Sequence, residues 1–245
     1  MNSAIFGYLL LLSACACTKL PPTFKKCNRN QNDLNECLSK AVKDAIEQLN
    51  RPFRDVGLPS MEPLEIPELT VGAGTGAVGL VQHFKNMKVH GFSKPETTKF
   101  EFDLGKKIAL LQCTFAEVKT VAEYDVNGKI LVLPVYGKGT STIKMENVTG
   151  TETFIMEKYE KKGQKYLKVV EGKLVLTPGL VKFKLENLFD GDKTLGDNIN
   201  SVMNENWKEV FADVKSSYEE AYSQIVETIF NNLLAKVPYD ELFEK

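Results

Sequence analysis

The residues that could carry chemistry in this chain are few and poorly spaced for catalysis or metal binding. His83 and His90 are the only two histidines. Seven positions apart in a strand-like stretch, they are expected to fall on opposite faces, and no cysteine or carboxylate cluster completes a metal site. No Gly-x-Ser-x-Gly elbow and no catalytic Cys/His pairing is present. The sequence therefore predicts a protein that is not an enzyme and that carries no metal or cofactor.

A glycine-rich stretch from Gly74 to Gly79 matches the pattern G-x-G-x-x-G. That pattern binds dinucleotides where a helix starts within it and aims its amides at a pyrophosphate. Here the continuation Leu80-Val81-Gln82-His83-Phe84 is typical of a strand. We therefore interpret the stretch as a glycine-rich turn or bulge between strands.

Two cysteines, Cys27 and Cys37, flank a short polar segment, residues 28–36. In a secreted protein a bridge closing this loop would contribute roughly 3 kcal/mol of stability; two reduced thiols are the alternative. Cys113 has no obvious partner and lies in a strand-like stretch, which favours a buried, small apolar residue over a reactive thiol. Asn147-Val148-Thr149 is a sequon for N-glycosylation, although sequons also remain unused.

The N-terminus has the pattern of a secretory signal peptide. The apolar run Ile5 to Leu12 is too short to cross a bilayer, and the small residues Ser13 to Cys17 follow it with an A-x-A site. No positive charge precedes the run, and a membrane anchor is the alternative. Leu12-Ser13-Ala14-Cys15 also resembles a bacterial lipoprotein box, but the missing charge counts more heavily against that interpretation. We expect residues 1–17 to be removed, with Cys17 at the boundary, and residues 18–245 to form a single extracellular domain.

Composition and charge are ordinary for a globular protein. The formal net charge is −1, and 43% of the residues are hydrophobic. A chain without a basic surplus has no electrostatic footprint for nucleic acid. We expect no nucleic-acid partner and no stable insertion into a membrane, and the composition sets no oligomeric state.

The C-terminal region, from Ile199 to Val237, has apolar residues at spacings of three and four, which is typical of one face of a helix. No proline or glycine interrupts it. One continuous helix of this length would be roughly 60 Å long. A compact sphere of this chain length would be roughly 45 Å across, so the pattern predicts an elongated molecule built along one helix. Trp207, in the first turns of this helix, is expected to be a packing anchor.

From Leu69 to Leu185 the apolar period changes to two, which predicts half-buried antiparallel strands, roughly eight to ten of them. Turns are expected at the four pairs Asn127-Gly128, Lys162-Gly163, Glu171-Gly172 and Pro178-Gly179. Ile130 to Val135 is apolar on both faces, which predicts a central strand. A short helix over Asn35 to Asn50 and a proline-rich crossing segment, residues 52–67, precede the sheet.

These elements predict an α+β fold in which a strongly curved antiparallel sheet wraps the long C-terminal helix. A helix offers an apolar stripe about 100° wide, which is narrower than the inner face of a many-stranded sheet. An empty gap between them would be costly, so we expect an internal hydrophobic tunnel that holds a lipid-like guest. Candidate tunnel residues, chosen from the inward phase of the pattern, are Val132, Phe154, Met156, Val210, Val214 and Ile225.

Several stretches together resemble the takeout and juvenile-hormone-binding protein family of insects over nearly the full mature length. They are Pro22 to Cys27 with Asn35 to Leu38, Glu62 to Pro67, Gly128 to Gly139, Asn187 to Asp192, Leu195-Gly196, Asn204 to Trp207, and Val237 to Asp240. The resemblance implies a secreted carrier of small hydrophobic ligands with a tubular lipid-binding fold. It also implies that the first disulfide of the family joins Cys27 and Cys37.

The chain departs from the family pattern at two positions: Ala122 stands where the family often has glycine, and Cys113 is not part of the pattern. A second bridge, such as hormone-binding members carry, has no obvious partner here, which favours the takeout branch. We therefore predict a secreted, extracellular carrier of an elongated hydrophobic ligand: a terpenoid hormone, a fatty acid or a similar lipid. The alternative is a membrane-active lipid-transfer or envelope-binding protein, which would require a basic or exposed apolar tip.

Overall fold

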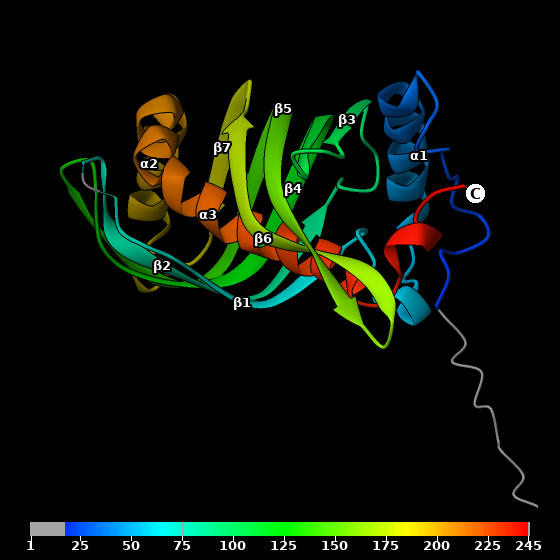
Figure 1. The fold of residues 1–245 in the computed structure, drawn as a ribbon. Coiled ribbons are helices and arrows are strands. Elements are labelled where there is room, and N and C mark those ends of the chain that lie inside the picture. The colour runs from blue at the N-terminus through cyan, green and yellow to red at the C-terminus, as the bar shows by residue number, and fades with distance from the viewer. Residues whose placement is uncertain (1–17, 75, 245) are drawn as a thin grey trace, which may run out of the picture.

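The computed structural model describes residues 18–74 and 76–244. Within these residues the chain forms a seven-stranded antiparallel sheet and three α-helices, which confirms the α+β class (Figure 1). The strands are β1 (Leu64–Val71), β2 (Val78–His90), β3 (Thr97–Asp103), β4 (Ile108–Ile130), β5 (Leu133–Lys161), β6 (Gln164–Thr177) and β7 (Leu180–Leu185). The helices are α1 (Leu34–Gln48), α2 (Lys193–Glu205) and α3 (Trp207–Leu234), with short 3-10 turns at Arg54–Val56, Phe189–Gly191 and Tyr239–Glu241.

Two long strands form the spine of the sheet. β4 and β5 pair antiparallel from their shared hairpin at Ile130↔Leu133 to Ile108↔Ile155. β2 and then β1 extend the sheet from the C-terminal half of β4, whereas β3 pairs with its N-terminal half. β7 and β6 pair with successive parts of β5. The sheet is strongly curved and does not close on itself (Figure 1).

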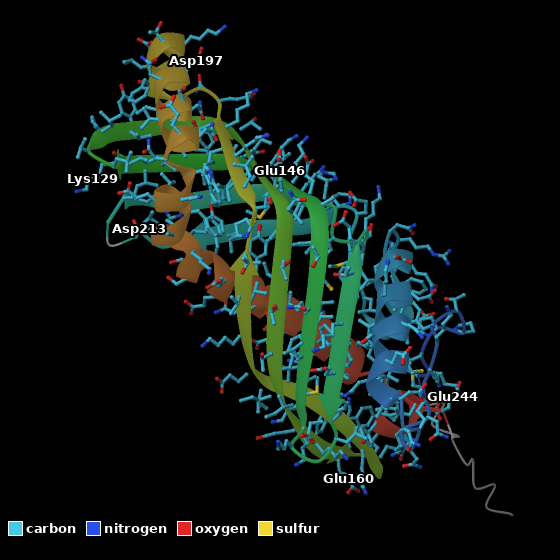
Figure 2. All side chains as sticks on the ribbon, turned by 90° about the horizontal axis from the view of Figure 1, so that it is seen from above. Lys129, Glu146, Glu160, Asp197, Asp213 and Glu244 are labelled. Carbon is cyan, nitrogen blue, oxygen red and sulfur yellow. A yellow bond between two sulfur atoms is a disulfide. The ribbon has the colours of Figure 1, made fainter. Side chains whose placement is uncertain are left out.

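The helices occupy distinct places on this sheet. α3 runs along the concave face, α2 stands at one end beside β7, and α1 lies at the other end beside β3 (Figure 1). The molecule is elongated, with Lys129 and Asp197 at one end and Glu160 and Glu244 at the other (Figure 2). The elongated shape and the curved sheet over a C-terminal helix agree with the prediction.

The prediction of one uninterrupted C-terminal helix is wrong. The helix breaks at Asn206, whose φ of −109° and ψ of 27° are not helical. The side chains of Asn200 and Asn204 bind the backbone of β7, which fixes the direction of α2. α3 then takes its own direction along the sheet for 28 residues, or about 42 Å.

The strand count of eight to ten is also wrong, because two expected turns lie inside strands. Asn127-Gly128 belongs to β4, and Glu171-Gly172 belongs to β6. A Cβ atom on Gly128 would lie 2.5 Å from the carbonyl oxygen of Gly79, so this glycine is needed for a close approach of two strands. The turn expected at Lys162-Gly163 is confirmed. The turn expected at Pro178-Gly179 is wrong: the chain only bends there, and β6 and β7 continue in the same direction along β5.

The predicted central strand Ile130 to Val135 is instead the β4–β5 hairpin. Ile130 ends β4, Leu131 adopts a positive φ of 54°, and Leu133 begins β5. The apolar run is therefore a turn flanked by two buried strand residues, Ile130 and Val135. An apolar run of this length does not distinguish a buried strand from a hairpin tip.

Helix side chains cover the open edges of the sheet. Asn204 both accepts from and donates to the backbone of Phe183 in β7, at 2.8 Å each. Asn231 in α3 does the same with Val169 in β6, at 2.8 and 3.1 Å. Ser39 in α1 bonds both backbone groups of Phe100 in β3. These side chains satisfy part of the unpaired edges of β3, β6 and β7 without a further strand.

Candidate functional site: an apolar cavity between the helix and the sheet

The candidate site is a cavity of about 170 Å³ between α3 and the concave face of the sheet, at the end near α1. Its wall is almost entirely hydrophobic. The lining residues are Ile46 of α1, Leu64 of β1, Leu111, Cys113, Phe115 and Val118 of β4, Met145, Val148, Gly150 and Glu152 of β5, Leu174 and Leu176 of β6, Tyr222, Ile225, Val226, Ile229 and Phe230 of α3, and Leu49, Met61 and Phe92 of the connecting segments. We call this the wide compartment.

A second cavity of about 20 Å³ lies under the same helix nearer α2, and we call it the narrow compartment. Residues from α2, α3 and four strands line it, including Met203, Val210 and Val214. A volume of this size holds about one water-sized sphere. This part of the interior is therefore close-packed.

Two stacked tyrosines of α3 lie where the two compartments approach each other: Tyr222 lines the wide compartment, and Tyr218 lies between it and Val214 of the narrow one. The rings of Tyr218 and Tyr222 are 6.4 Å apart, and their hydroxyls lie 3.0 Å from Gln82 Oε1 and 3.4 Å from Thr120 Oγ1. Burial raises the pKa of both phenols, so both are neutral. The tyrosines contribute neutral hydroxyl groups and aromatic surface to the interior.

The structure places the six predicted tunnel residues in four different environments. Ile225 lines the wide compartment, and Val210 and Val214 line the narrow one. Phe154 and Met156 are buried in a separate packed cluster and line neither cavity; Phe154 packs against Phe230, which does line the wide compartment. The inward orientation expected of Val132 is wrong, because this side chain is 90% exposed at the hairpin tip.

Sequence reasoning missed the one acidic residue in the cavity wall. Glu152 is 2% exposed, and the Ser223 hydroxyl donates to its Oε1 at 2.6 Å. Its Oε2 has no hydrogen-bond partner among the described residues. Glu152 shares the alternation of Phe154 and Met156 on β5, so its inward phase could be read from the sequence.

The protonation of Glu152 follows from its surroundings. Burial raises the pKa of this carboxyl to about 7, and the nearby Glu227 carboxylate adds to the rise, while the Ser223 hydroxyl and the Lys173 backbone amide oppose it. Gly172 makes room for both acids: a Cβ atom there would lie 2.6 Å from an oxygen of each. The wall of the wide compartment thus holds a carboxyl that titrates near neutral pH.

A second acidic residue holds part of the cavity rim in place. The Glu62 carboxylate accepts from the Gly91 amide and faces His90 Nδ1, both at 2.9 Å, and so ties together the segments that carry Met61 and Phe92. Partial burial would raise the pKa of Glu62, but these hydrogen bonds outweigh it and the pKa is lowered. The carboxylate is therefore ionised at neutral pH.

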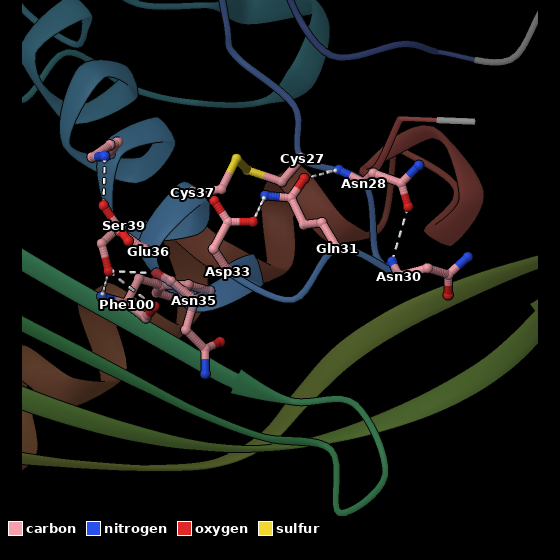
Figure 3. The surroundings of a disulfide bond; sticks show 11 residues. Cys27, Asn28, Asn30, Gln31, Asp33, Asn35, Glu36, Cys37, Ser39 and Phe100 are labelled. Atoms are coloured by element: carbon pink, nitrogen blue, oxygen red, sulfur yellow. Dashed lines mark hydrogen bonds and ion pairs between the residues drawn. A yellow bond between two sulfur atoms is a disulfide. The ribbon is translucent and has the colours of Figure 1, made fainter.

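The cysteines fall into two classes. Cys27 and Cys37 form a disulfide that joins the N-terminal segment to α1 (Figure 3). Cys113 is a buried free thiol in the wall of the wide compartment, and burial raises its pKa to about 11. The thiol is therefore protonated and acts as apolar surface.

The remaining sequence features do not converge on the cavity. Asn147 is exposed on β5. The glycine-rich stretch joins β1 to β2, and Asp213 of α3 accepts from the amides of Gly76 and Val78 at 2.8 and 2.6 Å. Trp207 is partly buried against the main core.

The expectation that the histidines lie on opposite faces is wrong. The buried positions of β2 change phase at an irregularity between Lys85 and Lys88, so His83 and His90 both fall on the outward face. They have separate partners, Thr70 and Glu62. Within the described residues no group of three potential ligands could hold a metal ion.

The comparison with protein families identifies the family of this chain. The model of the haemolymph juvenile hormone binding protein family matches residues 7–244. This chain belongs to that family. The family, as its description states, comprises juvenile hormone binding proteins of the haemolymph, and the resemblance drawn from the sequence motifs is confirmed.

Individual relatives agree with this assignment. The chain is 28% identical over 235 residues to the circadian clock-controlled protein daywake of Drosophila yakuba, which covers 91% of this chain and 88% of the relative. It is 32% identical over 87 residues to a juvenile hormone-binding protein of Manduca sexta, which covers 36% of this chain and 37% of the relative.

The fold matches that of Takeout 1 from Epiphyas postvittana. The TM-score is 0.77 at 24% sequence identity, with 90% of this chain and 99% of the other covered. Among the described residues no helix is both long and apolar enough to cross a membrane.

Proposed function

We propose that this protein is a secreted carrier that binds a small, elongated hydrophobic ligand between α3 and the sheet. The observation that carries the proposal is the wide compartment, a hydrophobic hollow inside a well-packed molecule. Burial of apolar area drives such binding at about 25 cal/mol per Å². The family of binding proteins to which the chain belongs supports a carrier over an enzyme.

The size of the cavity limits how the ligand is bound. A cavity of about 150 Å³ holds a molecule as small as benzene, and pockets for larger ligands measure about 300–1,000 Å³. At about 170 Å³ the wide compartment takes only part of a long ligand. The remainder requires movement of flexible lining residues such as Met61 and Met145, or a tunnel that joins both compartments past Tyr218 and Tyr222.

The ligand class is an apolar chain of terpenoid, fatty acyl or similar type. The name of the Manduca sexta relative supports a terpenoid hormone. A wall of Leu, Ile, Val and Phe selects for apolar character and length rather than for one molecule.

Native mass spectrometry of protein secreted from insect cells tests the carrier function. We expect a co-purified lipid, or uptake of an added long-chain ligand. Ile225→Trp, which fills the wide compartment, should abolish uptake. Val175→Trp, a matched control at a position of β6 that is 41% exposed, should leave uptake unchanged. Wild-type protein that stays ligand-free under all loading conditions would overturn the proposal.

We also propose that residues 1–17 are a signal peptide and that residues 18–245 act as one extracellular domain. The predicted signal peptide lies outside the described residues, and the disulfide supports an oxidising compartment. The intact mass of the secreted protein should match a chain that begins near residue 18. Treatment with an N-glycosidase should lower that mass in the wild type but not in Asn147→Gln if the sequon is used.

The second candidate function is membrane-active lipid transfer, and one observation favours it. The β4–β5 hairpin exposes Val132 by 90%, Tyr136 by 44% and Leu133 by 37%, which gives the apolar tip that this function requires. Co-sedimentation with neutral liposomes tests it. Binding that Val132→Asp removes would support membrane delivery, and no co-sedimentation of wild type would exclude it.

A further inference from the structure

Glu152 is a carboxyl in the wall of an otherwise apolar cavity, where it needs a hydrogen-bond partner such as a bound ligand. Carboxylates are rarely buried without a partner, and an unsatisfied buried polar atom destabilises the fold. The Oε1 of Glu152 accepts from the Ser223 hydroxyl, whereas its Oε2 has no hydrogen-bond partner among the described residues. A ligand atom that reached the other oxygen would complete the arrangement.

The geometry also fixes the role of each oxygen. Oε1 already accepts the Ser223 proton at 2.6 Å, so the proton of the neutral acid belongs on Oε2. The surroundings favour this neutral form: Glu227 of α3 is a second acid, 3.5 Å from the same hydroxyl, and the neighbours across the sheet are Leu111 and Leu174. No positively charged side chain is paired with Glu152 among the described residues. A protonated Oε2 is a hydrogen-bond donor.

We propose that Glu152 anchors the polar end of the ligand, with Oε2–H donating to an oxygen acceptor such as an ester, ketone or ether on an otherwise apolar chain. The proposal rests on the carrier function and adds to it an orientation and a class of polar group. A ligand without such an acceptor leaves the donor unsatisfied and binds more weakly. Ser223 acts as a positioning residue, since it fixes which oxygen carries the proton.

Proton uptake is then linked to ligand binding. Only the neutral acid donates, and the pKa of about 7 means that its population falls about tenfold between about pH 6 and about pH 8. Affinity for an acceptor-bearing ligand should fall by a similar factor over that range. Affinity for a plain hydrocarbon should not fall, because it makes no hydrogen bond to the acid.

The test compares two probes of equal length, a long-chain methyl ester and the corresponding n-alkane, by displacement of an apolar fluorophore. In wild type the preference for the ester over the alkane should be about tenfold at about pH 6 and nearly absent at about pH 8. Glu152→Gln, whose amide donates at every pH, should keep the preference and lose the pH dependence. Glu152→Leu should lose the preference altogether and still bind the alkane.

Two further variants separate anchoring from a structural role. Glu227→Gln removes the neighbouring negative charge and should shift the midpoint of the pH dependence to a lower pH. Glu157→Gln, an exposed glutamate of the same strand, should leave the preference and its midpoint unchanged.

The two possible failures can be told apart. If both probes bind wild type equally at every pH, Glu152 is not the anchor and the carrier function stands. If neither probe binds, both proposals fail.

Discussion

The two compartments under α3 differ in packing, although the same helix and the same sheet enclose them. The narrow compartment is filled by side chains to within about 20 Å³, and the wide compartment leaves about 170 Å³ empty. At about 24 cal/mol per Å³ an empty space of that size costs about 4 kcal/mol. The packing of the narrow compartment therefore stabilises the fold. The void in the wide compartment lowers the free energy of unfolding, and a bound ligand can raise it again.

The largest difference in stability between the two compartments is expected when an aromatic side chain is truncated in each of them. Phe84→Ala removes a ring that is 2% exposed and lines the narrow compartment, and should lower the free energy of unfolding by about 3–5 kcal/mol. Phe115→Ala, in the wall of the wide compartment, should cost at least about 1 kcal/mol less, because one side of its ring already faces a void. Urea unfolding of both variants measures the difference. Equal losses would show that the wide compartment is packed in solution.

Enlargement of a side chain should have opposite effects in the two compartments. Val214→Phe overfills the narrow compartment and should cost about 1–3 kcal/mol. Ile225→Phe projects into the wide compartment and should leave the stability of ligand-free protein unchanged or raise it. Thermal unfolding of delipidated protein provides the comparison, and a large loss from Ile225→Phe would contradict it.

The hydrogen bonds from helix side chains to the sheet edges should contribute equally to stability in β7 and in β6. Asn204→Ala and Asn231→Ala each remove a pair of hydrogen bonds to a strand backbone, in β7 and β6 respectively. Each should lower the free energy of unfolding by about 1–2 kcal/mol. Leu at the same positions should cost about as much, since it also lacks the amide; recovery of stability by Leu would mean that packing rather than hydrogen bonding matters there.

The smallest effect is expected at the rim of the wide compartment. The lowered pKa of Glu62 means that its carboxylate stabilises the folded protein above its unfolded-state pKa, and that this contribution is lost as the pH falls through the folded-state pKa. Glu62→Gln should therefore cost about 1 kcal/mol at neutral pH. The difference from wild type should vanish in acid, once the pH is below the folded-state pKa, which lies under the ordinary glutamate value of about 4.3. A difference that persists in acid would point to lost packing instead.

The sequence predicted the elements better than their boundaries. Helical spacing placed α1 correctly, and alternation in Phe100 and Phe102 marked β3. The break at Asn206 was invisible because it depends on asparagines that bind the backbone of β7, a tertiary contact. The hairpin at Leu131 was misread because an apolar turn and a buried strand have the same composition.

The candidate site was less predictable than the fold. Periodicity gives the phase of a side chain but not its depth, so Phe154 and Ile225 looked equivalent although only Ile225 reaches the wide compartment. Glu152 has the same inward phase as Phe154, but an apolar tunnel predicts apolar lining residues, so the pattern gives no reason to expect an acid there. The empty space itself arises from how α3 and the sheet meet, which no local pattern records.

Cys113 gives the molecule a built-in reporter. It is the single free cysteine in the part of the chain that the structure describes, and it lies in the wall of the wide compartment. A hydrophobic maleimide has to enter the wide compartment to alkylate this sulfur, so a bound ligand should slow the modification. The rate of labelling of the wild-type protein therefore measures whether the cavity holds a ligand, without an engineered tag.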